Sequence, residues 1–269
     1  MPTATETTGL SLRTVTATRY VTPLREGGSL PGLLEADDDG LYVVKFHAAG
    51  QGPKALVAEL IAGELGRAIG LPVPEIVLVE LAATLGRAEP DPEIQDLLVR
   101  SAGLDLGLDF LPGALPFDPA AAQRPGGERP DPELAADIVW FDAFITNVDR
   151  TAKNVNLLVW HRRLWLIDHG AALYIQHTWR EPAAHARRPF ERIADHVLLP
   201  YAGSIVDADR RLASRVDDDL LRSIVRAIPD AWLGDGADDQ REAYVAYLLA
   251  RLDARTGFVE EAERARTAA

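Results

Sequence analysis

The sequence predicts an α+β fold, with a small strand-rich amino-terminal part and a mainly helical carboxy-terminal part. Strands are expected at 19–24 and 41–46, where β-branched and aromatic residues are concentrated. Apolar residues recur at helical spacing around 193–199, 220–228 and 241–252. A length of 269 residues is enough for one large domain or for two small lobes with a substantial core.

The segment between the two amino-terminal strands, 25–32, is rich in glycine. Gly27, Gly28 and Ser29 could fold over phosphates through their backbone N–H groups. The segment matches neither a Walker A pattern nor Gly-x-Gly-x-x-Gly, so a plain solvent-exposed turn is an equal alternative. Residues 1–17 are rich in threonine and small side chains, and we expect them to form a flexible end.

The strand at 41–46 carries a lysine among apolar neighbours. If Lys45 is buried it needs an anionic partner, which a nucleotide phosphate or a helix glutamate would supply; otherwise it is an edge-strand lysine that faces water. The apolar spacing after it predicts a helix at 54–69, which contains Glu59 and Glu64. On a helical wheel Glu64 falls near the middle of the apolar stripe, whereas Glu59 lies on the far side.

The middle of the chain predicts two more strands, a linker and a helix. One strand is expected at 75–81, and a half-exposed strand is expected within 104–112, where aspartate and leucine alternate. Residues 116–132 are rich in proline, glycine and alanine, which is typical of a mobile linker. A helix capped by Asp131 then runs to Thr146 and leads the chain into a polar loop.

This loop and the turn after it place two acids and an amide where a phosphate-transfer enzyme needs them. Asp149 and Asn154 lie five residues apart, and a hairpin expected within 156–168 ends at Asp168. Asp149 can orient an acceptor hydroxyl and take its proton, although on its own it would be read as an Asx-turn acid. Asn154 and Asp168 supply oxygen ligands of the kind that magnesium prefers.

A strand lysine, a helix glutamate, a loop acid with its asparagine and an Asp-x-Gly turn follow one another in the order of a protein-kinase-like fold. Lys153 directly precedes Asn154 and could stabilise negative charge on a transferred phosphoryl group. A solvated surface lysine is the alternative at that position.

These motifs resemble those of HipA-type kinases. Residues 147–154, Asn-Val-Asp-Arg-Thr-Ala-Lys-Asn, resemble their catalytic loop, and 167–170, Ile-Asp-His-Gly, is similar to their metal-binding turn and related to that of phosphoinositide kinases. Gly-Leu-Pro-Val-Pro at 70–74 and Val-Val-Lys-Phe at 43–46 resemble the small HipA-like proteins. The resemblance spans roughly residues 18–200.

The resemblance implies a bilobal protein-kinase-like fold that uses ATP and Mg²⁺ to transfer the γ-phosphoryl group to a hydroxyl, on a protein serine or threonine or on a small molecule. It implies that Glu59 is the partner of Lys45, with Glu64 kept open. It also implies that the strand and hinge that hold adenine include Asp109, Phe110 and Leu111.

The same resemblance divides the chain into a nucleotide-binding lobe with hinge at 18–115, the linker at 116–132 and a catalytic helical lobe at 133–269. Two residues depart from the family pattern. Thr151 stands where HipA-type kinases often carry a histidine, so any role that needs the imidazole is lost. His169 stands where protein kinases carry a phenylalanine, and we expect it to pack or hydrogen-bond rather than to titrate in the reaction.

Two other functions stay open. One is a nucleotide-binding pseudokinase that acts as a regulatory or scaffolding module; the joint presence of the lysine, both acids and the asparagine speaks against it, since none of them is needed for a mere fold. The other is a toxin activity like that of full-length HipA. A neighbouring gene for a small helix-turn-helix protein would favour the toxin, whereas a biosynthetic gene cluster would favour a tailoring kinase.

Composition and charge restrict the partners. With 47% hydrophobic and 26% charged residues, the chain has the composition of a soluble globular protein, and its net charge of -13 repels nucleic-acid phosphates and anionic membrane surfaces. No apolar run approaches the roughly 20 residues that span a bilayer, and the amino terminus lacks the features of a signal peptide. We therefore expect a cytoplasmic protein without nucleic-acid or membrane partners.

The chain contains no cysteine, which excludes disulfides, thiolate nucleophiles and cysteine-ligated metals. Its six histidines include no His-x-x-x-His pair and no His-Glu-x-x-His motif. The sequence therefore argues against a zinc hydrolase.

Overall fold

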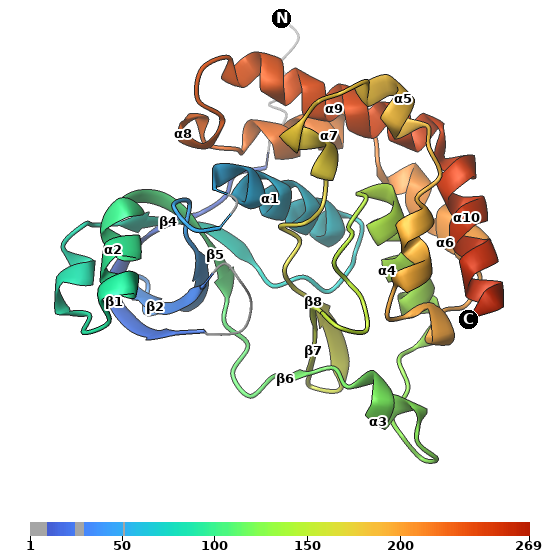
Figure 1. The fold of residues 1–269 in the computed structure, drawn as a ribbon, viewed down its shortest axis with the longest axis horizontal. Coiled ribbons are helices and arrows are strands. Elements are labelled where there is room, and N and C mark those ends of the chain that lie inside the picture. Colours follow the sequence, from blue (N-terminus) through green and yellow to red (C-terminus); the bar gives the residue numbers. More distant parts are fainter. Residues whose placement is uncertain (1–9, 25–29, 51) are drawn as a thin grey trace, which may run out of the picture.

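The amino-terminal part of the protein is a closed barrel of five strands (Figure 1). The computed structural model describes residues 10–24, 30–50 and 52–269. The barrel order is β1-β2-β3-β5-β4, and β1 and β4 are parallel where they close it. The strands are β1 (Thr14–Pro23), β2 (Gly32–Ala36), β3 (Leu41–Lys45), β4 (Ile76–Leu81) and β5 (Gly103–Asp109).

Strand β1 begins within the stretch that was expected to be a flexible end. Val15 and Ala17 alternate with exposed residues and are buried in the barrel, while Thr14 pairs with Leu78 of β4. A strand that closes a barrel gains hydrogen bonds on both edges, which local composition does not reveal. The boundary at residue 17 was therefore too late.

The two faces of β3 have different environments. Tyr42 and Val44 are buried in the barrel core, and because side chains alternate along a strand, Lys45 lies on the opposite face. On that face Lys45 is directly opposite Leu106 of β5. The half-exposed strand expected at 104–112 is β5, which ends at Asp109, and its Asp105 is fully buried and hydrogen-bonded to His47.

Helix α1 (Pro53–Ala68) lies between the barrel and the helical part of the chain (Figure 1). It begins after Gly52, and Pro53 occupies the first turn, where a missing N–H costs nothing. Every residue from Leu56 to Gly66 is buried. The helical wheel put Glu59 on the side far from the apolar stripe, but helix α1 is covered on both sides, so Glu59 is buried as well.

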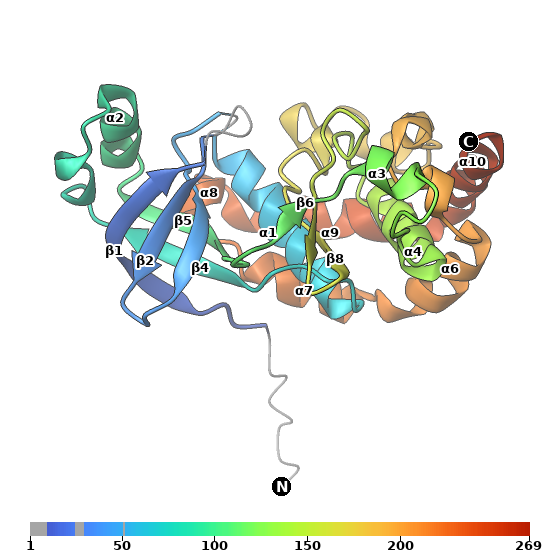
Figure 2. The ribbon, with the colours of Figure 1, turned by 90° about the horizontal axis from the view of Figure 1, so that it is seen from below.

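Three short elements precede the helical part. Helix α2 (Pro92–Arg100), capped by Asp91, covers one end of the barrel (Figure 2). The stretch expected to be a mobile linker includes β6 (Leu115–Pro116) and the short helix α3 (Pro119–Gln123), in which the Asp118 side chain accepts hydrogen bonds from two backbone N–H groups.

The carboxy-terminal part is mainly helical, and its core is continuous with that of α1. Within it Trp140 stacks on Phe144, and the ring of Phe258 lies edge-on to Trp140 and tilted against Phe144. In the described residues no helix is both long and apolar enough to cross a membrane. The helices are α4 (Pro132–Phe144), α5 (Pro182–Ala186), α6 (Ile205–Leu212), α7 (Asp218–Arg226), α8 (Asp230–Leu233), α9 (Ala237–Asp253) and α10 (Arg255–Ala268).

The hairpin expected within 156–168 is β7 (Leu157–Trp160) and β8 (Arg163–Leu166), joined to β6 in a small second sheet. The helix expected at 193–199 is instead two 3-10 turns, Glu191–Asp195 and Leu199–Tyr201. The extended backbone of His196 separates the two turns, and Pro200 lies at the start of the second, where a missing N–H is tolerated.

Candidate active site

Lys45 connects three elements at the junction of the barrel and the helical part. Its Nζ lies 2.6 Å from Glu59 Oε2 of α1 and 2.6 Å from Asp168 Oδ1, in the turn after β8. The lysine side chain is 11% exposed and that of Glu59 is fully buried, whereas the Asp168 side chain is 42% exposed. Asp168 has a left-handed backbone, with φ of 56°, at the point where the chain turns away from the strand. The fold thus brings together residues 123 positions apart.

The charges in this cluster stabilise one another. Burial opposes ionisation of Glu59, but attraction from Lys45 and a hydrogen bond from His169 outweigh it and hold the Glu59 pKa at about 2. Burial also disfavours the charged lysine, yet Glu59 and Asp168 together raise the pKa of Lys45. The backbone N–H of His169 donates to Glu59 Oε2 at 2.7 Å. Glu59 and Lys45 are therefore both ionised.

Glu64, the alternative partner of Lys45, lies elsewhere on α1. Its Oε1 is 3.5 Å from Arg67 Nε, one turn further along the helix. Burial raises the pKa of Glu64. Because Lys45 and Glu64 share no contact in the described residues, the lysine of β3 is paired with Glu59.

The polar loop after α4 is ordered by its own side chains. Asn154 Nδ2 donates to Asp149 Oδ2 at 2.6 Å, and the Asp149 N–H donates to Asn147 Oδ1 at 3.1 Å. Thr151 Oγ1 accepts from the backbone N–H groups of Lys153 and Asn154, both at 3.3 Å. The threonine that replaces the family's histidine therefore holds the turn between the acid and the asparagine.

The oxygen atoms left free in this arrangement suit a divalent cation. Asn154 uses its Nδ2 on Asp149, which leaves its Oδ1 available, and Asp168 uses Oδ1 on Lys45, which leaves Oδ2 available. Carboxylate and amide oxygens are the ligands that Mg²⁺ accepts, with water and phosphate completing its shell. The side chain of Lys153 is exposed and contacts no acid in the part of the chain that the structure describes.

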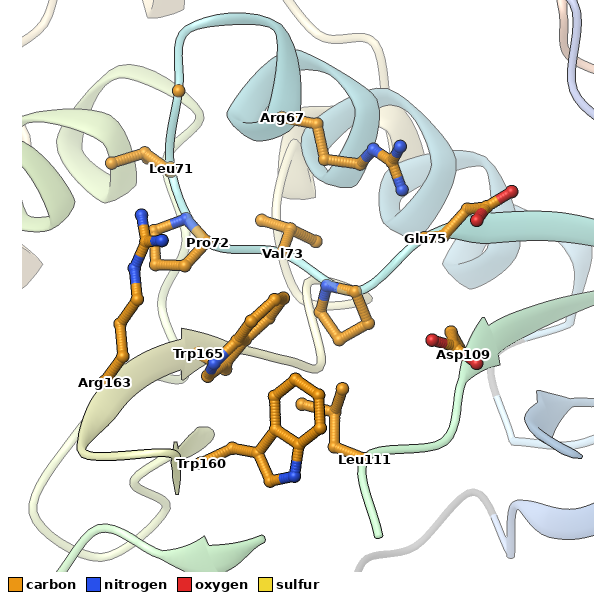
Figure 3. Close-up of a pocket in the computed structure, with 12 residues that line it drawn as sticks. Arg67, Leu71, Pro72, Val73, Glu75, Asp109, Leu111, Trp160, Arg163 and Trp165 are labelled. Carbon is orange, nitrogen blue, oxygen red and sulfur yellow. The ribbon is translucent and has the colours of Figure 1, made fainter.

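The strand register decides what the expected hinge can offer. Tyr42 pairs with Asp109 and Lys45 with Leu106, so the Asp109 carboxylate lies on the opposite face of the sheet from Lys45. Side chains of Asp109 and Leu111 instead line a hollow of about 480 Å³ between the α1–β4 connection and the β7–β8 hairpin (Figure 3). By the same alternation the partly exposed side chain of Phe110 lies on the Lys45 side, so the hinge can offer this ring and its backbone groups to a nucleotide there.

Two of those backbone groups are already used. The N–H of Asp109 donates to Glu75 O at 2.8 Å, and that of Phe110 donates to Leu41 O at 2.9 Å. The N–H of Leu111 has no acceptor among the described residues. Gly27, Gly28 and Ser29, the residues expected over the phosphates, lie outside the described residues.

Sequence reasoning missed a buried polar cluster beneath the loop. Asp142 of α4 accepts hydrogen bonds from Arg150 and His196 as well as from Asn147. Burial opposes ionisation of Asp142, but attraction from Arg150 and the hydrogen bond from His196 hold its pKa well below the usual range. The sequence carried one signal for this cluster, a single acid inside the otherwise apolar end of a helix.

Comparisons with known proteins bear on the family and the fold. The model of the HipA-like kinase family matches residues 18–256, and no curated protein matches the chain. A crystal structure of the Helicobacter pylori proinflammatory kinase CtkA is similar with a TM-score of 0.58 at 16% identity, covering 96% of this chain and 99% of that one. The Golgi casein kinase with Mn and ADP bound is similar with a TM-score of 0.52 at 13% identity, covering 95% and 75% respectively.

The two structural likenesses show a kinase-like fold, and at such low identity they show the fold alone. The family match extends over most of the chain and includes β3, α1, the polar loop and the turn at Asp168. It confirms the resemblance seen in the sequence. The chain therefore belongs to the HipA-like kinase family, and the protein is a kinase.

Proposed function

We propose that this kinase is an ATP- and magnesium-dependent phosphotransferase that transfers the γ-phosphoryl group to a hydroxyl, on a protein serine or threonine or on a small molecule. One observation carries the proposal. Lys45 Nζ is held at 2.6 Å from both Glu59 and Asp168, a partly exposed acid 123 residues away. A buried lysine held in this way stays charged and fixed in direction, which is what a phosphate ligand requires.

Each residue of the site has a role in this proposal. Lys45 binds the nucleotide phosphates, and Glu59 fixes the direction of its side chain. Asn154 and Asp168 hold magnesium through their free oxygens, and the bound ion would neutralise charge on the phosphates. Asp149, oriented by Asn154 at 2.6 Å, accepts the proton of the acceptor hydroxyl.

Two further groups complete the proposal. The exposed ammonium of Lys153, next to Asn154 in the loop, would stabilise charge that develops on the transferred group. The barrel and the helical part would be the two lobes of the kinase, and adenine would lie between them against the backbone of residues 109–111. The N–H of Leu111, which has no acceptor among the described residues, supports this position, because a purine edge offers acceptor nitrogens. Gly27, Gly28 and Ser29 remain candidates to cover the phosphates.

The likeness to a Golgi casein kinase crystallised with Mn and ADP is in keeping with use of a nucleotide and a divalent metal. Both acceptor classes fit the site, because Asp149 needs only a hydroxyl whose proton it can accept. Labelled γ-phosphate transferred to protein or small-molecule acceptors, measured together with ADP formation, would identify which class is used.

The test is a thermal unfolding experiment with ATP, with and without magnesium. A ligand that binds only the native state raises the melting temperature, so magnesium-ATP should stabilise the protein. Lys45→Ala should weaken the shift, whereas Asp96→Ala, which removes an exposed acid of α2, should not. An unchanged melting curve at saturating magnesium-ATP would refute nucleotide binding, and binding without any ADP formation would favour the pseudokinase.

A further inference from the structure

A single buried carboxylate gathers three segments beneath the catalytic loop. Asp142 Oδ1 accepts from Asn147 Nδ2 at 3.0 Å, and its Oδ2 accepts from Arg150 Nε at 2.6 Å and from His196 Nε2 at 2.9 Å. All four residues are buried. One acid and one arginine balance each other in charge, so the cluster is neutral as long as the histidine is neutral.

Two of these donors flank the proposed base. Asn147 uses its Nδ2 on Asp142 and its Oδ1 to accept the Asp149 N–H, so the amide bridges the buried acid and the loop backbone. Arg150 is the residue directly after Asp149. The backbone of Asp149 is therefore anchored on both sides, while its carboxylate remains free to accept from Asn154.

The arginine extends the same anchor to the metal-binding turn. Arg150 Nη1 donates to Ile167 O at 3.2 Å and also to the backbone oxygen of Asn156. Ile167 immediately precedes Asp168. A planar guanidinium can contact Asp142 and this strand end at the same time, which the single ammonium of a lysine cannot do in fixed geometry.

The histidine connects a third segment. The backbones of Thr151 and His196 pair as a single antiparallel β-bridge, and the N–H of Val197 donates to Arg150 O at 3.1 Å. The N–H of Leu198 donates to His196 Nδ1 at 3.1 Å, so this nitrogen is an acceptor and the proton must be on Nε2, which donates to Asp142. Burial lowers the pKa of His196, against the opposing effect of Asp142.

We propose that Asp142, Arg150 and His196 are positioning residues for phosphoryl transfer. Through them the segment around His196, which lies beside the catalytic loop, fixes Asp149 relative to Asp168. The inference rests on the proposed function, because it assigns the cluster to the geometry of that reaction. It predicts a loss in the chemical step and not in nucleotide affinity, since none of the three residues contacts Lys45 or Glu59 in the described residues.

The experiment uses two variants of His196, because removal of Asp142 would leave Arg150 buried and unpaired and could prevent folding. His196→Ala deletes the donor to Asp142, whereas His196→Gln keeps an amide N–H that can reach the same carboxylate. The control is His185→Ala, which removes another partly buried histidine that contacts Tyr247 outside the cluster. For each protein kcat, KM for ATP and the affinity for magnesium-ADP are measured, together with the melting temperature.

We expect His196→Ala to lower kcat by roughly 10- to 100-fold, the range found when partners that orient catalytic ligands are removed. KM for ATP and magnesium-ADP affinity should stay within about twofold of wild type, and His196→Gln should recover most of kcat. Arg150→Lys keeps the positive charge but loses the planar guanidinium with its several N–H donors. Its kcat should fall as in His196→Ala.

Three results would overturn the inference while leaving the proposed function intact. These are wild-type kcat in His196→Ala, an equal loss of kcat in His196→Gln at an unchanged melting temperature, or an equal loss in the His185→Ala control. Absence of turnover in the wild-type protein with every acceptor would instead overturn the proposed function itself, and this inference with it.

Discussion

Replacing Lys45 by methionine tests how much the buried ion pair between Lys45 and Glu59 contributes to stability. Methionine keeps the length of the side chain but removes the ammonium that contacts the Glu59 carboxylate, which is fully buried and has a pKa of about 2. Breaking a buried ion pair by removing one partner costs about 3–5 kcal/mol, because the remaining charge is left without compensation. For a chain of this size, that loss is a fall in melting temperature of roughly 6 to 20 °C.

The assay is a double-mutant cycle in denaturant or by calorimetry, with Lys45→Met, Glu59→Gln and the combined variant. If the ion pair is stabilised as described, the combined variant should lose less free energy than the two single losses added together. The matched control is Arg100→Met, whose exposed pair with Asp96 should contribute at most about 0.5 kcal/mol. A Lys45→Met protein within about 1 kcal/mol of wild type, or strictly additive losses, would refute the reasoning.

Three further predictions concern the loop, the metal and the barrel. Asp149→Asn should keep nucleotide affinity by calorimetry while phosphoryl transfer, followed as ADP formation, falls about 10²-fold or more, and unchanged turnover would remove Asp149 from the mechanism. Asp168→Ala should make the nucleotide-induced rise in melting temperature nearly independent of magnesium; full magnesium dependence in that variant would place the metal elsewhere. A hydrogen bond from His47 to Asp105 raises the pKa of His47 above 6.5, so its contribution to stability is complete below pH 6.5 and is lost as pH rises through the folded-state pKa. His47→Gln should therefore reduce the decline in unfolding free energy between pH 6 and 8, and an identical profile in both proteins would contradict this assignment.

The polar loop at 147–154 and the turn at Asp168 could be predicted from the sequence because their residues are close together in the chain. Asp149, Asn154 and Asp168 follow a spacing that local turns and one hairpin largely determine. The partner of Lys45 was harder to predict, since a helical wheel assumes one buried face. Helix α1 is buried on both sides, and Glu59 is therefore inside a core that only tertiary packing creates.

Other parts of the site depend on contacts between distant segments. The register between β3 and β5 turns the Asp109 side chain away from Lys45, and no local pattern encodes a register. His196 reaches Asp142 across 54 positions, without any motif around it. The sequence signal for this cluster was Asp142, an acid in an apolar helix. Such an acid needs a partner when it is buried, but the sequence does not show which residue that partner is.

The burial of α1 on both sides also bears on how this kinase can be controlled. At the start of the helix, Lys54 Nζ donates to Gln176 O of the helical part. At its end, Arg215 Nη1 of the helical part donates to Ile69 O. Swinging α1 outward would bring its 11 consecutive buried residues into water, and each large aliphatic side chain among them costs about 1.5–3 kcal/mol to expose. That sum is comparable to the whole stability of a typical domain. An off state made by displacing α1 would therefore be nearly an unfolded state, and the lysine–glutamate pair is a permanent part of the scaffold.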